Sequence, residues 1–306
     1  MSLTLRVWRF IDGRPGHEKQ TEGLVRGLGA CLPDFAGEAS ELEVRDIAMV
    51  DFAKDSSALW RDPGQAPDLL IGAGRSTHVP MARTRWHLGS RAVVLMKPSL
   101  PSFCYDLAVV PEHDNLWSER KVLRSIGAMG PSVTGAARSN RGLILLGGEN
   151  PHFYFADPVV AASAAQIIAQ SPEVHWQISD SPRSSPNLIR LVSEAIQDAA
   201  NATVVHYRDN SSAWLSQELS QAGQVWVSAD SASMLYEALS SNACVGVIEL
   251  TSKGQRNKLA AGIKALREQN RLGRLCDGSL DRQSLNSEPL REHLRCARWI
   301  LERWFN

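Results

Sequence analysis

Short apolar runs alternate with segments of helical periodicity along most of this chain. A short apolar run that ends in glycine is typical of a buried parallel strand, whereas apolar residues three and four positions apart are typical of a helix. The runs predict strands at residues 3–11, 42–49, 68–73, 91–97, 106–110, 122–126, 143–146, 174–179, 203–207, 224–228 and 244–250. The periodic segments predict helices at residues 17–32, 157–170, 186–200, 212–222, 231–240, 258–269 and 290–305.

Several helix starts in the second half of the chain carry capping signals. Asp157 and Ser185 are each followed by a proline, which is favoured at the first position of a helix. We expect Asp157 and Ser185 to cap their helices, and Ser211 or Ser212 to cap the next one.

This alternation of strands and helices predicts the α/β class, with parallel sheets covered by helices on both faces. At 306 residues the chain is about twice as long as a typical single domain. We therefore expect two Rossmann-like domains facing a cleft, residues 1–138 and 139–285, with the boundary in the polar segment 136–141. Residues 286–306 are expected to form a helix that crosses back and packs on the N-terminal domain.

Charge and cysteine usage narrow the class of protein. The chain has 33 basic and 33 acidic residues, and a balanced charge argues against a nucleic-acid-binding protein. Its five cysteines are scattered and include no C-x-x-C pair, so we expect reduced, buried thiols in a cytoplasmic protein. No stretch of about 18 apolar residues predicts a membrane-spanning helix. The first residues contain Arg6 and Arg9 and run into a glycine loop, so they indicate a strand and not a signal peptide.

The first candidate site is the loop after the first strand. Ligands of open α/β sheets bind at the carboxyl ends of strands, and Gly13 and Gly16 let the backbone approach a ligand there. Histidine titrates near neutral pH, so His17 is a candidate general base, and Asp12 is the alternative. A tight turn with a solvated histidine would explain the same residues.

The second candidate loop, GAGRST at residues 72–77, resembles a dinucleotide-binding fingerprint. Thr77 stands where the third glycine is required, and no acidic residue follows at the required spacing, so a nicotinamide or flavin cofactor is not expected. We expect Gly74 and Arg75 to line the cleft, with Arg75 available to an anionic group. A purely structural turn is the alternative.

A third loop places Glu112 and His113 after a strand. Adjacent residues of an extended segment point in different directions, so this cluster is a poor metal site. We expect no metal here, and place Glu112 and His113 at the edge of the cleft on the acceptor side.

Two loops of the second half predict a nucleotide site. Gly147 and Gly148 end a strand, and their amides are expected to cradle phosphate oxygens, although loop flexibility would also explain them. Asp230 ends another strand where a helix begins. Ser231 and Ser233, with the amides of the first turn, form an expected anion site.

Glu237 lies about two turns along that helix, from which its carboxylate is expected to reach ribose hydroxyls. The alternative is that Ser231 only caps the helix and Glu237 only faces solvent. Neither a D-x-D triplet nor a P-loop occurs, which favours metal-independent chemistry.

Together these loops resemble the mitochondrial-fission family named for elongated mitochondria, which has many bacterial members. The resemblance is carried by DGRPGHEKQTEGL (12–24), DLLIGAGRSTHVP (68–80), YDLAVVPEHD (105–114), GGENPHFYF (147–155) and SADSASMLYEA (228–238). It implies a glycosyltransferase fold of the GT-B type. Members carry a serine- and arginine-rich loop that is weaker here, at residues 179–186, which leaves the role of Arg183 open.

More distantly, the layout is similar to that of the N-acetylglucosamine transferase of peptidoglycan synthesis. Gly16-His17, the glycine pair at 147–148 and the turn from Ser231 to Glu237 match its glycine-histidine loop, glycine loop and ribose-binding glutamate. Serines stand in that turn where glycines are usual.

The resulting hypothesis is a metal-independent glycosyltransferase without a cofactor. A nucleoside-diphosphate sugar would bind the second domain, and His17 or Asp12 would deprotonate a hydroxyl of a cell-envelope glycan or lipid-linked acceptor. A non-hydrolysing nucleotide-sugar epimerase and a non-catalytic scaffold are the alternatives. The arginines and tryptophans of the last helix leave contact with the inner face of a membrane open, although such a helix more often packs on its own domain.

Overall fold

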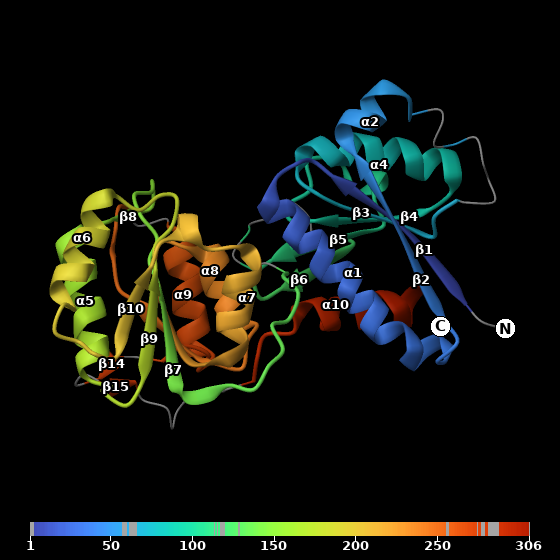
Figure 1. Ribbon diagram of the computed structural model, residues 1–306. Helices are drawn as coiled ribbons and strands as arrows, with labels where there is room; N and C mark the ends of the chain where they lie inside the picture. The colour runs from blue at the N-terminus through green and yellow to red at the C-terminus, as the bar shows by residue number, and fades with distance from the viewer. Residues whose placement is uncertain are drawn as a thin grey trace. The chain divides into compact units, whose positions relative to one another are not determined.

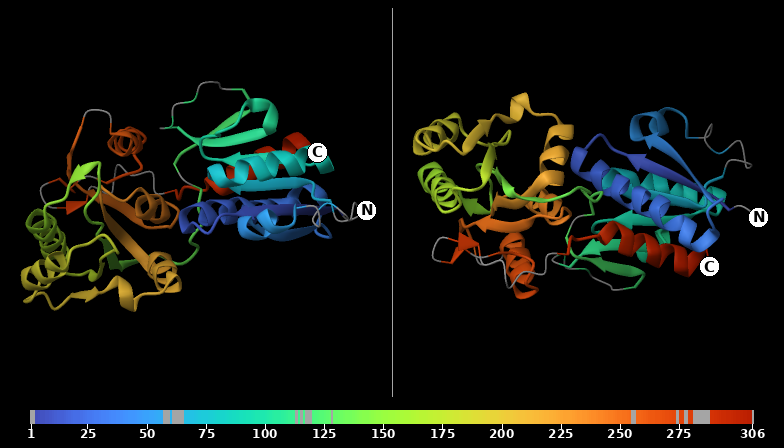
Figure 2. Two further views of the ribbon diagram at one scale, coloured as in Figure 1. Left: turned by 90° about the horizontal axis from the view of Figure 1, so that it is seen from above. Right: turned by 60° about the horizontal axis from the view of Figure 1, so that its bottom comes forward.

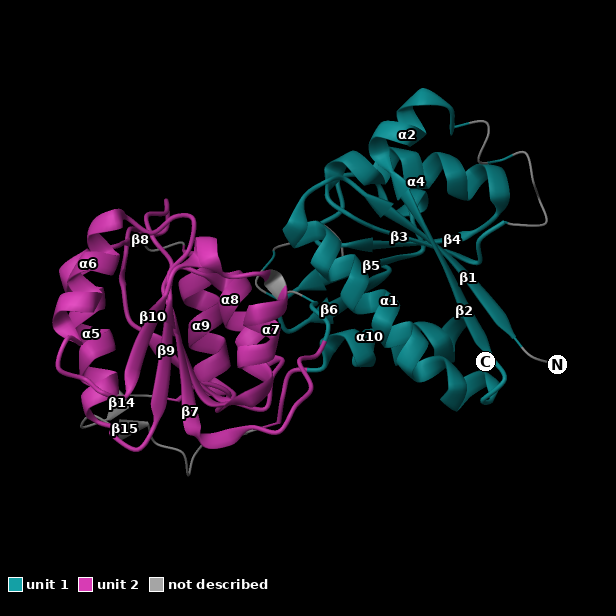
Figure 3. Ribbon diagram, viewed as in Figure 1, with its two compact units in different colours: residues 1–131, 291–306 teal, residues 132–290 magenta. Residues whose placement is uncertain are grey.

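A computed structural model describes residues 3–56, 60, 66–112, 114, 116, 120–127, 129–254, 257–273, 275–276, 279–280 and 288–305. The chain forms two compact units (Figure 3). Unit 1 comprises Met1–Pro131 and Arg291–Asn306, and unit 2 comprises Ser132–Leu290. The sequence placed the first boundary a few residues later, in a polar segment that proves to be the start of a strand.

Unit 1 is built on a parallel sheet with the strand order β2-β1-β3-β4-β5-β6 (Figure 1). Its strands are β1 (Thr4–Ile11), β2 (Glu41–Ala48), β3 (Leu69–Ala73), β4 (Arg91–Leu95), β5 (Leu107–Pro111) and β6 (Val122–Ser125). Strands β3, β4 and β5 are almost entirely apolar and buried, as expected of strands covered on both faces.

Helices cover both faces of this sheet. Helices α1 (Pro15–Ala36) and α10 (Glu292–Trp304) share one hydrophobic core with the sheet. Helices α2 (Met49–Lys54) and α4 (Arg75–Leu88) lie over the other face, where Phe52 and Met81 join the second core. The sequence predicted a strand up to residue 49 and missed α2, because six residues are too few to show helical periodicity.

The C-terminal helix crosses back to unit 1, as the sequence predicted. Figure 2 shows α10 beside α1. The two helices approach so closely that a Cβ atom on Gly27 of α1 would lie 2.4 Å from the carbonyl oxygen of His293. The stripe of α10 that faces the core includes Cys296, Ile300 and Leu301, all fully buried.

Unit 2 is built on a second parallel sheet, with the order β10-β9-β7-β11-β12. Its strands are β7 (Arg138–Leu145), β9 (His175–Ser179), β10 (Ala202–Val205), β11 (Ala222–Ser228) and β12 (Cys244–Ile248). Short antiparallel pairs join β8 (Phe153–Tyr154) to β13 (Thr251–Ser252) and β14 (Leu275–Cys276) to β15 (Ser279–Leu280).

Helices α5 (Asp157–Ala169) and α6 (Pro186–Ala195) share a core with one face of this sheet. Helices α7 (Ser212–Gln221) and α8 (Ala232–Leu239) contact the strands from outside that core, and α9 (Lys258–Glu268) packs beside α8. Single-turn 3-10 helices are formed by η2 (Ser102–Cys104) and η3 (Tyr207–Asp209).

The expected caps are confirmed in part. Ser185 and Ser211 accept hydrogen bonds from the amides of Leu188 and Trp214, so both cap their helices. Asp157 was predicted to cap α5 but is its first helical residue, and Ala156 occupies the cap position. The Asp157 carboxylate instead accepts hydrogen bonds from the side chains of Ser185 and Asn187, and so links α5 to α6.

Each sheet has one point at which the strand order reverses. In unit 1 this point lies between β1 and β3, and in unit 2 between β7 and β11. The loops that leave the carboxyl ends of such strand pairs diverge to opposite faces of the sheet and leave room for a ligand. These two points are therefore where a binding site is expected. Within the described residues, no helix has the length and apolar content that crossing a bilayer requires.

Candidate functional site

Asp12 and His17 meet at the reversal point of unit 1. β1 ends at Ile11, Asp12 follows it, and His17 lies in the first turn of α1. The Nδ1 atom of His17 lies 2.9 Å from Oδ2 of Asp12. A carboxylate accepts hydrogen bonds, so Nδ1–H of His17 donates to it and Nε2 is left as the proton acceptor of the ring.

The Asp12 carboxylate is held at several points. Ser76 donates its hydroxyl to the same Oδ2 atom at 2.9 Å, and the amide of Arg14 donates to Oδ1 at 3.2 Å. Burial alone would raise the pKa of Asp12, but the hydrogen bonds from His17, Ser76 and Arg14 lower it below its ordinary value. Asp12 is therefore ionised at neutral pH and its side chain is only 4% exposed, whereas that of His17 is 19% exposed. This makes Asp12 the orienting group and His17 the accessible one.

Gly74 leaves the room in which this pair sits. It precedes α4 with φ +86°, and a Cβ atom there would lie 2.4 Å from Nδ1 of His17 and 3.1 Å from Oδ2 of Asp12. The sequence predicted Gly74 as part of the site, and the structure places it directly against the histidine. The absence of a side chain at Gly74 makes room for the side chains of His17 and Asp12.

The other residues expected around this loop are distributed as follows. Gly13 has φ +79° and donates its amide to Glu18, while Gly16 lies exposed in the first turn of α1. Arg75 is the exposed first residue of α4. Gly13, Gly16 and Arg75 thus border the Asp12–His17 pair.

Glu112 does not join this cluster. It follows β5, which lies three strands from β1, roughly 14 Å at the usual strand spacing of about 4.8 Å. Its charge acts on Arg295 of α10 instead. His113, predicted with it, lies outside the described residues.

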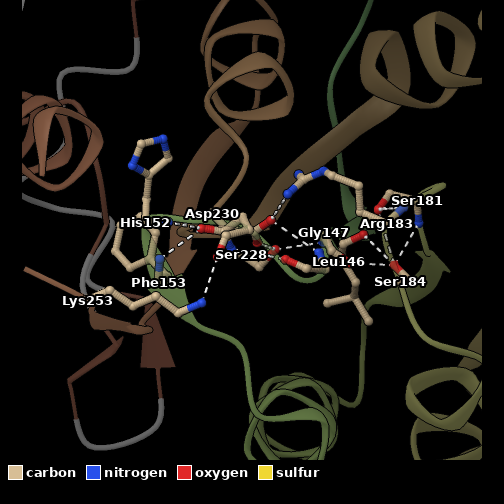
Figure 4. Close-up of polar contacts among 12 residues, drawn as sticks. Leu146, Gly147, His152, Phe153, Ser181, Arg183, Ser184, Ser228, Asp230 and Lys253 are labelled. Atoms are coloured by element: carbon tan, nitrogen blue, oxygen red, sulfur yellow. Dashed lines mark hydrogen bonds and ion pairs between the residues drawn. The ribbon is translucent and has the colours of Figure 1, made fainter.

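Asp230 organises the reversal point of unit 2 (Figure 4). Its side chain is fully buried. One oxygen accepts the amide of Gly148 at 3.1 Å and the Nη1 atom of Arg183 at 2.8 Å, and the other accepts the hydroxyl of Ser228 at 2.6 Å. Asp230 therefore joins the loops that follow β7, β9 and β11.

The glycine pair after β7 proves to have a packing role. The amide of Gly147 donates to Oγ of Ser228 at 2.7 Å, and the amide of Gly148 to Asp230. A Cβ atom on Gly147 would lie 2.1 Å from the Asp230 carboxylate, and one on Gly148 would lie 1.9 Å from the carbonyl oxygen of Arg183. Both amides predicted to cradle a phosphate thus already have partners, and neither position has room for a side chain.

Arg183, whose role the sequence left open, supplies a positive charge to this site. Its loop is packed by Ser181 and Ser184, and the Ser184 hydroxyl donates to the carbonyl oxygen of Gly147. The guanidinium is 40% exposed while it pairs with Asp230, so it presents its remaining donors toward solvent. The run of serines around Arg183 was the available sequence signal.

Helix α8 begins directly after Asp230 without a side-chain cap. Ser231 occupies the cap position and is largely buried, but its hydroxyl makes no bond to the helix amides. Ser231 therefore occupies the expected cap position without making the side-chain capping bond. Ser233 and Glu237 lie four residues apart, hence on one face of α8, and both are more exposed than their neighbours Leu235 and Tyr236.

Across the part of the chain that the structure describes, no group of three or more histidine, cysteine, aspartate or glutamate side chains is arranged to hold a metal ion.

Comparisons with known proteins agree with this architecture. The family model described as Mitochondrial fission ELM1 matches residues 15–304. No protein with a curated description matches the sequence.

Solved structures share the fold at low sequence identity. A UDP-GlcNAc 2-epimerase from Neisseria meningitidis, bound to UDP-GlcNAc, has a TM-score of 0.59 at 11% identity, over 98% of this chain and 100% of that chain. The UDP-GlcNAc 2-epimerase of Methanocaldococcus jannaschii has a TM-score of 0.50 at 11% identity, with the same coverage. MurG of Acinetobacter baumannii has a TM-score of 0.45 at 11% identity, over 99% of this chain and 91% of that chain. The fold is the GT-B type, with two Rossmann-like domains.

Proposed function

The chain belongs to the Mitochondrial fission ELM1 family, and on that premise we propose that it is a glycosyltransferase that uses a nucleoside-diphosphate sugar. The donor binds unit 2, and unit 1 holds the acceptor hydroxyl of a cell-envelope glycan or lipid-linked sugar. The chemistry needs neither a metal nor a further cofactor.

The turn from Asp230 into α8 is the observation that carries this proposal. It lies at the reversal point of the sheet, where open α/β sheets bind nucleotides. The first amides of α8 receive no side-chain cap, so a diphosphate can accept their hydrogen bonds and is favoured by the helix dipole. The exposed part of Arg183 adds positive charge beside them.

Glu237 is the proposed ribose ligand. It lies five residues into α8, about 7.5 Å along the helix axis from Ala232 at about 1.5 Å per residue. Ser233 and Glu237 share one face of the helix, so a nucleotide along that face can meet Ser233 at its diphosphate and Glu237 at its ribose. The Neisseria epimerase was solved with UDP-GlcNAc bound, which supports a uridine nucleotide as the first ligand to test.

His17 is the proposed general base. Nε2 of the ring can take the proton of an acceptor hydroxyl, because Nδ1–H is committed to Asp12. The ionised Asp12 stabilises the imidazolium that then forms and fixes the tautomer. Of the two candidates that the sequence left open, Asp12 is the positioning residue, since its oxygens are already engaged.

Binding and turnover separate these roles. We expect UDP to stabilise the chain against thermal unfolding. Glu237→Ala should weaken UDP binding by about 10- to 100-fold, because a bond to a charged group is lost. The exposed Glu268→Ala at the end of α9 is the matched control and should bind UDP normally. Normal binding by Glu237→Ala would show that the nucleotide lies elsewhere.

His17→Ala should bind UDP normally and lose sugar transfer by about 10²- to 10⁴-fold. The assay incubates the chain with UDP-sugars and lipid-linked acceptors and follows UDP release.

The same assay tests the alternatives. Conversion of UDP-GlcNAc to its 2-epimer without an acceptor would establish the epimerase. Failure of every nucleotide sugar to bind would favour a non-catalytic scaffold.

A further inference from the structure

His78 is a buried histidine that has no role in the reaction proposed above. It is the fourth residue of α4 and is only 3% exposed. Its Nδ1 atom lies 2.6 Å from Oγ of Ser99 and 3.2 Å from the amide nitrogen of Ser99, in the segment that follows β4. β4 is the neighbour of β3, so these contacts lie at the carboxyl edge of the unit 1 sheet.

The contacts with Ser99 determine where the ring carries its proton. An amide can only donate, so Nδ1 of His78 is an acceptor and has no hydrogen. Burial lowers the pKa of His78 to about 4, and the charges of Arg75 and His17 act in the same direction, so the ring is neutral at pH 7. The single proton of a neutral ring must therefore be on Nε2.

Nε2–H of His78 has no acceptor among the described residues. A buried donor without a partner is unfavourable, and such donors are rare unless a ligand or an ordered water supplies the acceptor. Other unpartnered buried donors, such as the indoles of Trp176 and Trp226, pack against Gly142 and Gly246 inside the sheet of unit 2. His78 differs from them in lying beside the candidate catalytic pair.

His78 and His17 belong to the same corner of unit 1. The His17 ring packs against Gly74 at the start of α4, and His78 is four residues further along, one helical turn away. His17 is also one of the charges that act on His78. The two rings therefore lie near the same end of α4, close enough for the charge of His17 to act on His78.

We propose that Nε2–H of His78 donates a hydrogen bond to an oxygen of the acceptor sugar, and so binds the hydroxyl-bearing substrate beside His17. This inference rests on the proposed function, from which it takes the role of unit 1. An uncharged donor suits a neutral hydroxyl or carbonyl oxygen.

Two substitutions separate this role from the structural contact with Ser99. His78→Asn places an amide oxygen near the position of Nδ1, so it keeps the acceptor for Ser99 and removes the distal donor. His78→Gln places an NH₂ group near the position of Nε2, so it keeps the distal donor and removes the contact with Ser99. Opposite effects of the two variants would not follow from a general loss of packing.

The experiment titrates the full chain, labelled with ¹⁵N-histidine, with free N-acetylglucosamine and with glucose, and follows the His17 and His78 ring signals by NMR. We expect a sugar to shift the Nε2–H signal of His78. His78→Asn should bind that sugar roughly tenfold more weakly, and His78→Gln should stay within about threefold of the unchanged chain.

The proposal is overturned if no sugar moves the His78 signal, if only His17 responds, or if His78→Asn binds as tightly as the unchanged chain. The His78 signal of the unchanged chain tests the proposal even if a variant does not fold. UDP binding is measured on the same sample. UDP binding without a His78 response refutes the inference alone, and a His78 response without UDP binding refutes the proposed donor site alone.

Discussion

Asp12 and Asp230 each join loops that are neighbours in space and distant in the sequence. Asp12 connects the loop after β1 to Ser76 at the start of α4, and Asp230 connects its own loop to Gly148 and Arg183. A buried carboxylate is stable only when its oxygens are bonded, so these contacts hold the loops to one another.

Substitution of Gly74 should disturb the His17 site in addition to straining the backbone at this position. Gly74→Ala places a methyl group against the His17 ring at a backbone conformation that is nearly restricted to glycine, with φ +86° and ψ 153°. We expect a loss of about 2 kcal/mol or more in the free energy of unfolding, measured in urea, and a shifted His17 ring signal.

The matched control is Gly89→Ala at the other end of α4. Gly89 also has a positive φ, +74°, but no atom lies within 4 Å of a Cβ built there. Gly89→Ala should lower the free energy of unfolding by about 1 kcal/mol, the strain of a left-handed backbone, and leave the His17 ring signal unchanged. Equal effects of the two variants would contradict the role assigned to Gly74.

The buried neutral ring of His78 makes the free energy of unfolding depend on pH. Its folded pKa of about 4 lies below its ordinary value of 6.5, so the unfolded chain binds a proton between these values and the folded chain does not. Stability conferred by this residue is therefore present above pH 6.5 and is lost as the pH falls toward 4. The total is about 3 kcal/mol, at about 1.4 kcal/mol per pH unit.

Urea unfolding at pH 7.5 and pH 5 measures this loss. The unchanged chain should lose about 2 kcal/mol more than His78→Asn between the two values. Equal losses would show that His78 is charged in the folded chain.

Sequence patterns singled out Asp12 and His17 as alternative bases because both lie in the loop after the first strand, but they did not predict the bond between them. They could not show that Ser76 shares the carboxylate, since that contact depends on β1 and β3 being adjacent in the sheet. His78 was missed for a related reason. Nothing local distinguishes a buried histidine from an exposed one, and its contact with Ser99 joins helix α4 to the segment that follows β4.

At the scale of elements, the close crossing of α1 and α10 depends on one glycine. Gly27→Ala would place a methyl group 2.4 Å from backbone of α10, which cannot move aside as a side chain can. We expect a loss of several kcal/mol, because the helices must separate and open the core between them.

Gly29→Ala in the same helix is the control. Its methyl group would meet only the end of the Leu42 side chain, at 3.3 Å. Alanine also has the higher helix propensity, by about 1 kcal/mol, so this variant should be neutral or stabilised in thermal unfolding. If Gly27→Ala and Gly29→Ala have the same thermal stability, the crossing of α1 and α10 accepts a methyl group at Gly27 and this prediction is wrong.

Strands were predicted well where they are buried on both faces, as in β3 and β5. The start of β7 was missed because residues 138–141 are polar and mostly exposed, so they carry no apolar signal although they pair with β11 and β9. Hydrogen-bonded pairing decided the boundary there, and hydrophobic patterning alone cannot report it.

At the scale of the whole molecule, each unit combines a parallel sheet, covering helices and a reversal point that holds a candidate site. The strand order could not be predicted from the sequence, and it decides which loops meet. It brings the loops after β1 and β3 together in unit 1, and those after β7 and β11 in unit 2.

Removal of residues 291–306 should affect unit 1 alone. These residues supply buried core side chains to unit 1, and none of the described ones belongs to the core that α5 and α6 share with the sheet of unit 2. We expect the shortened chain to lose the cooperative unfolding of unit 1 and to become protease-sensitive there, while residues 132–290 resist digestion. A protected fragment that contains α1 would contradict this expectation.

The return of α10 to α1 also bears on the order in which the chain is made. The ribosome must synthesise all of unit 2 between the two helices, so unit 2 can fold while the first core still lacks one of its walls. Until α10 emerges, the apolar face of α1 and the sheet beneath it stay open to water and to other nascent chains. Chaperone demand during synthesis should therefore fall on the N-terminal segment, which is made first and completed last.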